Sequence, residues 1–503
     1  MHFNKTKHRV KQAKELIMIS APFLFSLFSQ NSLFIVFSIF LSHQNRKYNC
    51  KGDGTMNLLI RDVTVYTVND KDEILTHASI AVENGKIKKI YRAGEVITED
   101  AKEILEGAGK AVFPGFVNTH IHIFQSLLKG LGADHRLIEW LNLSALPYGE
   151  KIGSDLQYEA ARLASMEALQ SGCTTLSEFF YTTQSEELAH AVIQGMQDIG
   201  IRSVFIRTFQ DTGLEYGMPK CFLEDAATAM KKVDALVRQY QGKSDMLQIW
   251  TGPDVTWSTT KEGYQTMLEY CNSEKVNYSM HIQETEVDNE MTNRYYGKNV
   301  VDLLEEIGFL TDRFLAVHCV NLTDHEIDLF AQHGVSISHN PMANMYLGSG
   351  YAPTVKCLQK GVRVTLGTDG AASNNTTNML ETLKMACVTQ KANYRDAAIL
   401  TAPQILRAAT IEGAKAIKMD HLIGSIEEGK KADLIVFNPH QLTSFPCHDP
   451  LASLVYSSTI QNIETTIVDG KVVYHQGNFS SLNSLDGFYH SVEEKLDRVK
   501  REI

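Results

Sequence analysis

The chain has 503 residues, of which 44% are hydrophobic, so it can bury one large core and a smaller second one. Its formal net charge of −11 argues against a nucleic-acid partner, because neutralising phosphate groups needs clustered Lys and Arg. The eight cysteines form no Cys-x-x-Cys pair, which argues against a zinc ribbon or a disulfide framework and predicts free thiols in a reducing compartment.

The first 55 residues differ in composition from the rest of the chain. Residues 16–42 form a long apolar run, broken by Gln30 and Asn31 and flanked by basic residues, which is typical of a membrane anchor or an uncleaved signal. The competing hypothesis is that residues 1–55 are translated leader and that the native protein begins at Met56. We favour the leader, and with it a cytoplasmic protein, because residues 1–55 carry eight Lys and Arg against two acidic residues and the composition changes at Met56.

Strand patterns occur near both ends of the remaining chain. Residues 58–66 alternate between apolar and polar, and a matching pattern returns in residues 429–437 and 466–473. Each piece is too short to fold alone. We therefore expect residues 56–113 and 421–480 to pair into one small β-sandwich domain, followed by a C-terminal helix in residues 481–503.

Between these pieces, short β-branched runs alternate with amphipathic helical stretches, which is typical of βαβ units. The strand candidates begin near Phe116, Thr174, Ile201, Leu247, Asn277, Phe314, Val335 and Val362. Eight parallel strands are enough to close a barrel. The predicted fold class is therefore α/β, with a (β/α)8 TIM-like barrel over residues 114–420.

Local capping signals support the predicted helices. Ser154 and Gln157 have the spacing of a capping box at the start of one helix, and Gly172 can end that helix in the left-handed conformation. Thr323 and Glu326 offer a second capping box after the sixth strand.

Several predicted strands end in residues that can bind a metal ion. The first strand ends in His120 and His122, and a two-residue spacing on an extended chain puts both imidazoles on one face. His281, His318 and Asp369 follow three other strands. Each residue alone is more often an ordinary core or loop residue, but the carboxyl ends of barrel strands converge on one site. Together they predict a metal centre there.

Imidazole nitrogens with one carboxylate suit a borderline divalent cation, of which zinc is expected first and iron or manganese are alternatives. A bound divalent ion lowers the pKa of its water towards about 7 and so supplies hydroxide as a nucleophile. No lysine that could be carbamylated, and so bridge two metal ions, stands at the end of the fourth or fifth strand. One ion is therefore expected.

Ordered motifs carry a resemblance to a known family. They are residues 114–122, 281–285, 317–319, 338–344 and 367–375. In these motifs the chain resembles the amidohydrolase superfamily. It is most similar to the branch of methylthioadenosine and S-adenosylhomocysteine deaminases, with chlorotriazine hydrolases and guanine-type deaminases nearby. The resemblance extends from about Met56 to Gly477.

The resemblance implies roles for the strand-end residues. It places His120, His122, His281 and Asp369 around a single metal ion. It makes Glu284 the residue that transfers a proton from water on the metal to the ring nitrogen of the substrate. Glu284 follows the expected ligand His281 by three residues, so its carboxyl group can reach both the water and the ring. It gives His318 a hydrogen bond to the attacking hydroxide, and it gives Asp369 a second task as base and as proton donor to leaving ammonia.

The resemblance also implies substrate contacts, which are expected from Trp140, Glu150, Arg207, Asp254 and Asn344. Trp140 could equally be a core aromatic, and Arg207 could equally form a salt bridge at the barrel rim. Glu150 follows its proline with one residue more than in the nucleoside deaminases, where the corresponding glutamate holds ribose hydroxyls. Asp254 stands where those enzymes carry histidine, and its carboxylate could accept hydrogen bonds from the NH-rich edge of a pterin, triazine or purine.

The leading hypothesis is therefore a hydrolase that releases ammonia from an aminated nitrogen heterocycle, with methylthioadenosine or S-adenosylhomocysteine expected first. A triazine hydrolase that removes chloride or an alkylamine is the alternative, and an inactive binding scaffold is a remote one. The resemblance further implies a small-molecule heterocyclic substrate and a homo-oligomer.

Overall fold

The computed structural model describes residues 56–214 and 217–503. The anchor and leader hypotheses fall on residues 1–55 and lie outside this described part. Within it, no helix combines the length and the apolar character that crossing a membrane requires. All cysteines in the described ranges are free thiols.

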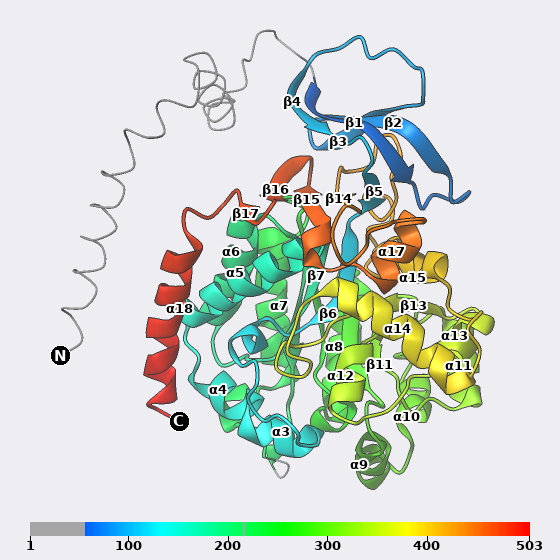
Figure 1. The fold of residues 1–503 in the computed structure, drawn as a ribbon. Coiled ribbons are helices and arrows are strands. Elements are labelled where there is room, and N and C mark those ends of the chain that lie inside the picture. Colours follow the sequence, from blue (N-terminus) through cyan, green and yellow to red (C-terminus); the bar gives the residue numbers. More distant parts are fainter. Residues whose placement is uncertain (1–55, 215–216) are drawn as a thin grey trace, which may run out of the picture. The chain divides into compact units, whose positions relative to one another are not determined.

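Eight parallel strands form the central sheet, and each pairs with its neighbours in chain order (Figure 1). They are β6 (Phe116–Ile121), β7 (Cys173–Phe180), β8 (Arg202–Phe209), β9 (Leu247–Pro253), β10 (Tyr278–Ile282), β11 (Phe314–His318), β12 (Ser336–His339) and β13 (Arg363–Leu366). Most of their side chains are buried on both faces, as in other parallel sheets covered by helices. The predicted eight strands and the barrel are confirmed.

Buried threonines join the first and last strands of the barrel. The Thr119 hydroxyl on β6 lies 2.8 Å from the Thr365 hydroxyl and donates to the Leu366 carbonyl at 3.0 Å, both on β13. It also lies 2.8 Å from the Ser338 hydroxyl on β12. These polar contacts inside the barrel bring the ends of β6 and β13 together, which matters for the site described below.

Helices surround the barrel and fill the connections between its strands. The outer helices are α5 (Ser154–Gln170), α6 (Glu186–Ile199), α7 (Ala226–Tyr240), α8 (Lys261–Glu274), α10 (Val300–Glu306), α11 (Asp324–His333), α13 (Thr354–Gln359), α14 (Met379–Tyr394), α15 (Ala402–Ala409) and α16 (Ile411–Ala416). Further helices follow the strand ends directly: α3 (Leu137–Leu143) and α4 (Ala145–Lys151) after β6, α9 (Glu286–Tyr296) after β10 and α12 (Pro341–Tyr346) after β12. These last helices lie in the connections that are expected to shape a substrate pocket.

The capping predictions have different outcomes. The Thr323 hydroxyl accepts from the Glu326 amide at 3.3 Å, and the Glu326 carboxylate accepts from the Thr323 amide at 2.7 Å, so this capping box is confirmed. Gly172 has φ +88° at the end of α5, as predicted. The capping box at Ser154 is wrong, because α5 begins with Gly153 as N-cap and the Ser154 hydroxyl donates instead to Glu187 at 2.7 Å.

Strands from both ends of the chain pair into one further sheet of nine strands. They are β1 (Met56–Tyr66), β2 (Ile74–Glu83), β3 (Lys86–Tyr91), β4 (Ala101–Glu106), β5 (Ala111–Pro114), β14 (Leu434–Phe437), β15 (Ile463–Val468), β16 (Lys471–His475) and β17 (Asn478–Phe479). The two parts meet where β5 pairs antiparallel with β14. One apolar cluster contains Ile60 and Ile80 from the first part and Leu434 and Ile467 from the second. Neither part could complete this core alone.

A buried ion pair fastens this sheet to the barrel. Arg202 at the start of β8 donates two hydrogen bonds to the Asp433 carboxylate, at 2.7 and 2.9 Å, and both side chains are almost fully buried. The paired geometry satisfies both carboxylate oxygens. The remaining elements are α17 (Pro450–Tyr456) and α18 (Leu485–Lys500), and α18 packs on α5, where Lys495 forms an ion pair with Glu159 at 2.6 Å.

Candidate active site

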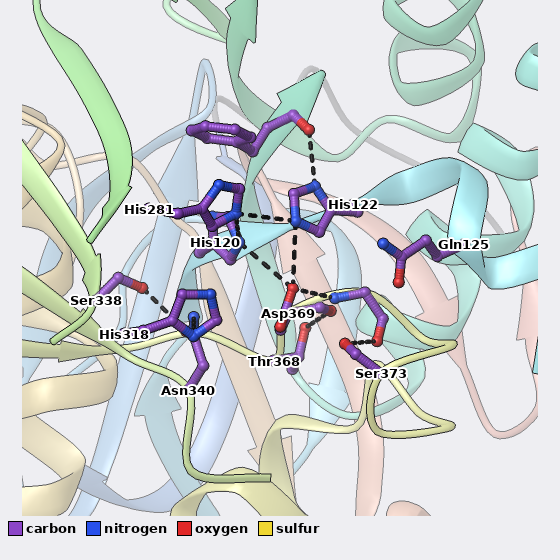
Figure 2. A network of polar contacts seen from close by, with 12 residues as sticks. His120, His122, Gln125, His281, His318, Ser338, Asn340, Thr368, Asp369 and Ser373 are labelled. Carbon is purple, nitrogen blue, oxygen red and sulfur yellow. Dashed lines mark hydrogen bonds and ion pairs between the residues drawn. The ribbon is translucent and has the colours of Figure 1, made fainter. Parts of the chain in front are cut away.

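Four side chains from three strand ends point at one spot in the barrel mouth (Figure 2). The Nε2 atom of His281, on β10, lies 3.2 Å from Nε2 of His122 and 3.3 Å from Nε2 of His120. The Oδ1 atom of Asp369, which follows β13, lies 3.4 Å from Nε2 of each of these two β6 histidines. The structure thus brings together all four residues expected to hold a metal.

The spacing of these atoms fits one shared ion. Ligand atoms about 2.0–2.1 Å from an ion at tetrahedral angles stand about 3.4 Å apart, close to the distances observed. His120 and Asp369 also belong to a second possible ligand group with His318. The donor set of imidazole nitrogens and one carboxylate oxygen suits a transition-metal cation.

The electrostatics keep the two β6 histidines and Asp369 in the forms that bind metals. For His281, burial acts to lower the pKa, but hydrogen bonds with Asp254 and the charges of Asp254 and Asp369 raise it. Burial lowers the pKa of His122 to about 4 and holds the pKa of His120 well below its usual range, so both imidazoles are neutral. Burial alone would raise the pKa of Asp369, but a hydrogen bond with His120 and the charges of the neighbouring histidines hold it below the ordinary value. The site therefore offers nitrogen lone pairs and an ionised carboxylate together.

Neighbouring groups orient the ligand side chains. His122 Nδ1 lies 2.9 Å from the Phe179 carbonyl of β7, and His281 Nδ1 lies 2.9 Å from the Asp254 carbonyl that follows β9. With a carbonyl acceptor at Nδ1, each ring carries its proton there and presents a bare Nε2 to the centre. The Asp369 amide donates to the His120 carbonyl at 3.0 Å, which ties β6 to the end of β13.

The backbone turns sharply at two of the strand ends. His318 has φ 70° and Asp369 has φ 63°, both in the left-handed region that non-glycine residues rarely adopt. Before Asp369, a Cβ at Gly367 would collide with Asn340 Oδ1 and lie 3.0 Å from the Cβ of His120. Glycine at this position lets β13 approach β6 closely enough for Asp369 to reach the centre.

A carboxyl group and a fourth imidazole lie beside the centre. Glu284 Oε2 is 3.6 Å from Nε2 of His318, and the Ser349 hydroxyl donates to Glu284 Oε1 at 3.2 Å. Burial, followed by the charge of Asp369, raises the pKa of Glu284 to about 7. Burial lowers the pKa of His318 to about 4, and Nδ1 of this ring lies 2.9 Å from Asn344 Oδ1. Glu284 can therefore gain or lose a proton near neutral pH.

The residues expected to contact substrate divide into two groups. Trp140 and Asp254 line the pocket above the centre together with Glu284 and His318. Asn344 is buried in α12 and contacts His318, so it positions that ring.

Two expected substrate contacts do not reach this pocket. Glu150 is exposed on α4 and is not among the residues that line it. Arg207 is buried on β8 and forms ion pairs with Glu186 and Glu224. This agrees with the alternative prediction for Arg207, a salt bridge in place of a substrate contact. Neither residue is therefore among those that line the pocket in the described structure.

The pocket also contains residues that the sequence analysis missed. Gln125, Tyr181, Trp257 and Asp288 all line it. Trp257 donates from its indole nitrogen to Asp288 at 3.2 Å, and burial raises the pKa of this carboxyl to about 6. The spacing of Thr285 and Asp288, a capping box at the start of α9, was a signal that could have located Asp288 beside the His281 motif.

Comparisons with known proteins agree with this geometry. Residues 111–473 match the family described as "Amidohydrolase family". The chain belongs to the amidohydrolase family. It is therefore an enzyme of a metal-dependent hydrolase family.

Similar proteins carry deaminase names. The 5'-deoxyadenosine deaminase of Methanosarcina acetivorans is 34% identical over 83% of this chain and 92% of its own length. The 5-methylthioadenosine/S-adenosylhomocysteine deaminase of Caldicellulosiruptor saccharolyticus is 30% identical over 85% of this chain and 95% of its own length. The resemblance seen in the sequence motifs is thus confirmed.

Solved structures share the fold and contain zinc. An adenosine deaminase from Xanthomonas campestris with bound zinc has a TM-score of 0.83 at 26% identity, covering 89% of this chain and 99% of that one. An atrazine chlorohydrolase from Arthrobacter aurescens TC1 complexed with zinc has a TM-score of 0.81 at 25% identity, covering 87% and 100%. The fold supports both deaminases and triazine hydrolases, so the substrate has to be argued from the site.

Proposed function

We propose that this amidohydrolase is a zinc-dependent deaminase that hydrolyses the amino group from an adenosine-type nucleoside, with a 5'-deoxy or 5'-thioether adenosine as the first candidate. The observation that carries the proposal is the convergence of His120, His122, His281 and Asp369 on one spot, with the buried Glu284 carboxyl group beside it, 3.6 Å from His318. Burial raises the pKa of Glu284 to about 7. The two relatives named for deamination of 5'-modified adenosines support this substrate class.

His120, His122, His281 and Asp369 would hold the ion. Zinc is proposed because the ligand set suits it and similar structures contain it. A divalent cation bound there would polarise water and supply hydroxide near neutral pH.

The chain's own residues then manage the protons. Ionised Glu284 accepts a proton as water attacks the amino-bearing carbon, and it delivers that proton to the adjacent ring nitrogen. The neutral His318 ring donates from Nδ1 to Asn344 Oδ1, so its bare Nε2 can accept a hydrogen bond from the attacking water. Asp369 takes the remaining proton and passes it to the amino group, which leaves as ammonia.

Two pocket residues are proposed to recognise the rest of the substrate. The Asp254 carboxylate lines the pocket, and apart from His281 Nδ1 at 3.5 Å it has oxygen lone pairs facing the pocket to accept hydrogen bonds from substrate NH or OH groups. The buried Trp140 indole NH has no hydrogen-bond partner in the described structure, so it can donate to an acceptor on the substrate. Asp254 thereby takes the place of Glu150 as the carboxylate that selects the substrate.

Removal of chloride or an alkylamine from a triazine is the second candidate, favoured by the similar zinc-containing atrazine chlorohydrolase. Glu284 and Asp369 favour deamination, because the ring nitrogen must gain one proton during attack and the amino group must gain another before it leaves as ammonia. A scaffold without activity would be expected to lack ligands, and none of the four is missing. A homo-oligomer stays a prediction.

An ammonia-release screen tests the proposal. The zinc-loaded full chain is incubated with 5'-deoxyadenosine, 5'-methylthioadenosine, adenosine, guanine, aminated pterins and triazines, with metal-free protein as control. We expect zinc-dependent ammonia release, fastest from the 5'-modified adenosines. Chloride or alkylamine release from triazines, without ammonia from any nucleoside, would replace the proposal with the second candidate.

A further inference from the structure

The residues that line the pocket are of two kinds. One kind is polar and includes Gln125, Tyr181, Glu284 and His318. The other kind includes aliphatic side chains of α3, α4 and the segments after β10 and β12: Leu137, Ile138, Leu141, Leu146, Val287 and Leu347. We call these six residues the apolar wall.

No Lys or Arg of the described residues accompanies the apolar wall. The charged side chains that line the pocket are carboxyl groups, namely Asp254, Glu284, Asp288 and Asp369. None of the Lys and Arg residues in the ranges 56–214 and 217–503 lines it. Arg207, which was expected to contact the substrate, forms ion pairs with Glu186 and Glu224 and is 1% exposed.

The chemistry fixes which end of a nucleoside meets this wall. The amino-bearing carbon has to lie beside Glu284 and the metal ligands for proton transfer to occur. The end of the molecule farthest from the amino group, the 5' substituent, therefore extends towards the remaining lining, which is mostly apolar and includes the apolar wall. An alkyl or thioether group gains free energy by leaving water for such a surface. A carboxylate placed there would lose its hydration without gaining a cationic partner, in a pocket whose charged Asp and Glu side chains repel it.

We infer that the enzyme selects nucleosides whose 5' substituent is apolar and uncharged, and that it discriminates against a 5' substituent that carries an amino-acid head group. This inference rests on the proposed function and narrows its substrate class. Of the two substrates expected first from the sequence, 5'-methylthioadenosine is accepted and S-adenosylhomocysteine is a poor substrate.

A matched pair of substrates tests the inference. 5'-n-Butylthioadenosine has nearly the chain length of S-adenosylhomocysteine but lacks its ammonium and carboxylate groups. With the zinc-loaded full chain, kcat/KM for the butylthio compound should lie within about 10-fold of that for 5'-methylthioadenosine, and kcat/KM for S-adenosylhomocysteine should be lower by about 100-fold or more. A value for S-adenosylhomocysteine equal to that for the butylthio compound would overturn the inference. If both long substrates failed equally, length rather than charge would decide, which also contradicts it.

A substitution in the wall provides a second test. Ile138 on α3 lines the pocket and is 41% exposed, so the fold should tolerate a longer side chain there. Ile138→Arg should raise kcat/KM for S-adenosylhomocysteine about 10-fold relative to the butylthio compound, whereas the uncharged control Ile138→Gln should leave this ratio unchanged. An unchanged ratio in Ile138→Arg would contradict the placement of the 5' end at α3. Absence of ammonia release from every nucleoside would instead contradict the proposed function itself.

Discussion

The two ends of the pocket are built from different parts of the chain. At the metal end, the side chains stand on the carboxyl ends of β6, β10 and β13, and second contacts to neighbouring strands fix their orientation. At the other end, the apolar wall stands mainly on helices and segments that connect strands to outer helices, and its members are aliphatic. The barrel thus positions the proposed metal ligands, while the connections are proposed to select the substrate. Changes at the metal end should alter kcat, and changes among recognition residues should alter KM.

The largest effect is expected at Glu284. Glu284→Gln keeps the size of the side chain and the hydrogen bond from Ser349 but cannot carry the proton, so kcat should fall by about 1,000-fold. Zinc content and the midpoint of thermal unfolding should stay at wild-type values or rise, because a buried carboxyl group is removed. Steady-state ammonia release with metal analysis measures both. If the variant kept more than a tenth of wild-type kcat, this would contradict the expectation that changes at the metal end of the pocket alter kcat.

An intermediate effect is expected at Asp254. Asp254→Asn keeps the backbone carbonyl that orients His281 but replaces the carboxylate that faces the pocket. KM should rise about 10-fold with kcat and zinc content nearly unchanged. The matched control is Glu150→Gln, which lies off the pocket and should change KM less than about 2-fold. If the two variants exchanged these effects, the ribose contact first expected of Glu150 would be right.

The smallest effect is a shift in pH dependence. Glu284 must be ionised to accept a proton, and burial raises its pKa to about 7, so kcat/KM should rise with pH through this value and level off above it. The hydrogen bond from Ser349 favours the ionised form. Ser349→Ala should therefore move the inflection upward by about half a pH unit while the plateau changes less than about 3-fold. A downward shift would show that Ser349 does not act on this carboxyl group.

The same division explains what the sequence could predict. Each ligand motif is local, since His120 and His122 share one strand end and Asp369 follows another, and barrel topology alone brings strand ends together. The eight strand starts were predictable because buried parallel strands read as continuous apolar runs.

The substrate end was less predictable because it depends on the paths of connections. Arg207 meets Glu186 and Glu224 rather than a substrate, and only the course of the segments that carry these partners decides this. Ser154 likewise has the capping-box spacing with Gln157 in the sequence. In the fold, its hydroxyl donates instead to Glu187, which another helix brings close. The apolar wall gathers residues from several connections, so no single motif reveals it.

One ion is proposed to bind to His120, His122, His281 and Asp369, although His318 lies close enough to form another ligand group with His120 and Asp369. Metal analysis of His281→Ala and His318→Ala, purified under identical conditions with zinc supplied, distinguishes the two ligand sets. We expect one ion per chain in wild type and in His318→Ala, and less than about a tenth of that in His281→Ala. Full metal content in His281→Ala together with loss in His318→Ala would contradict it.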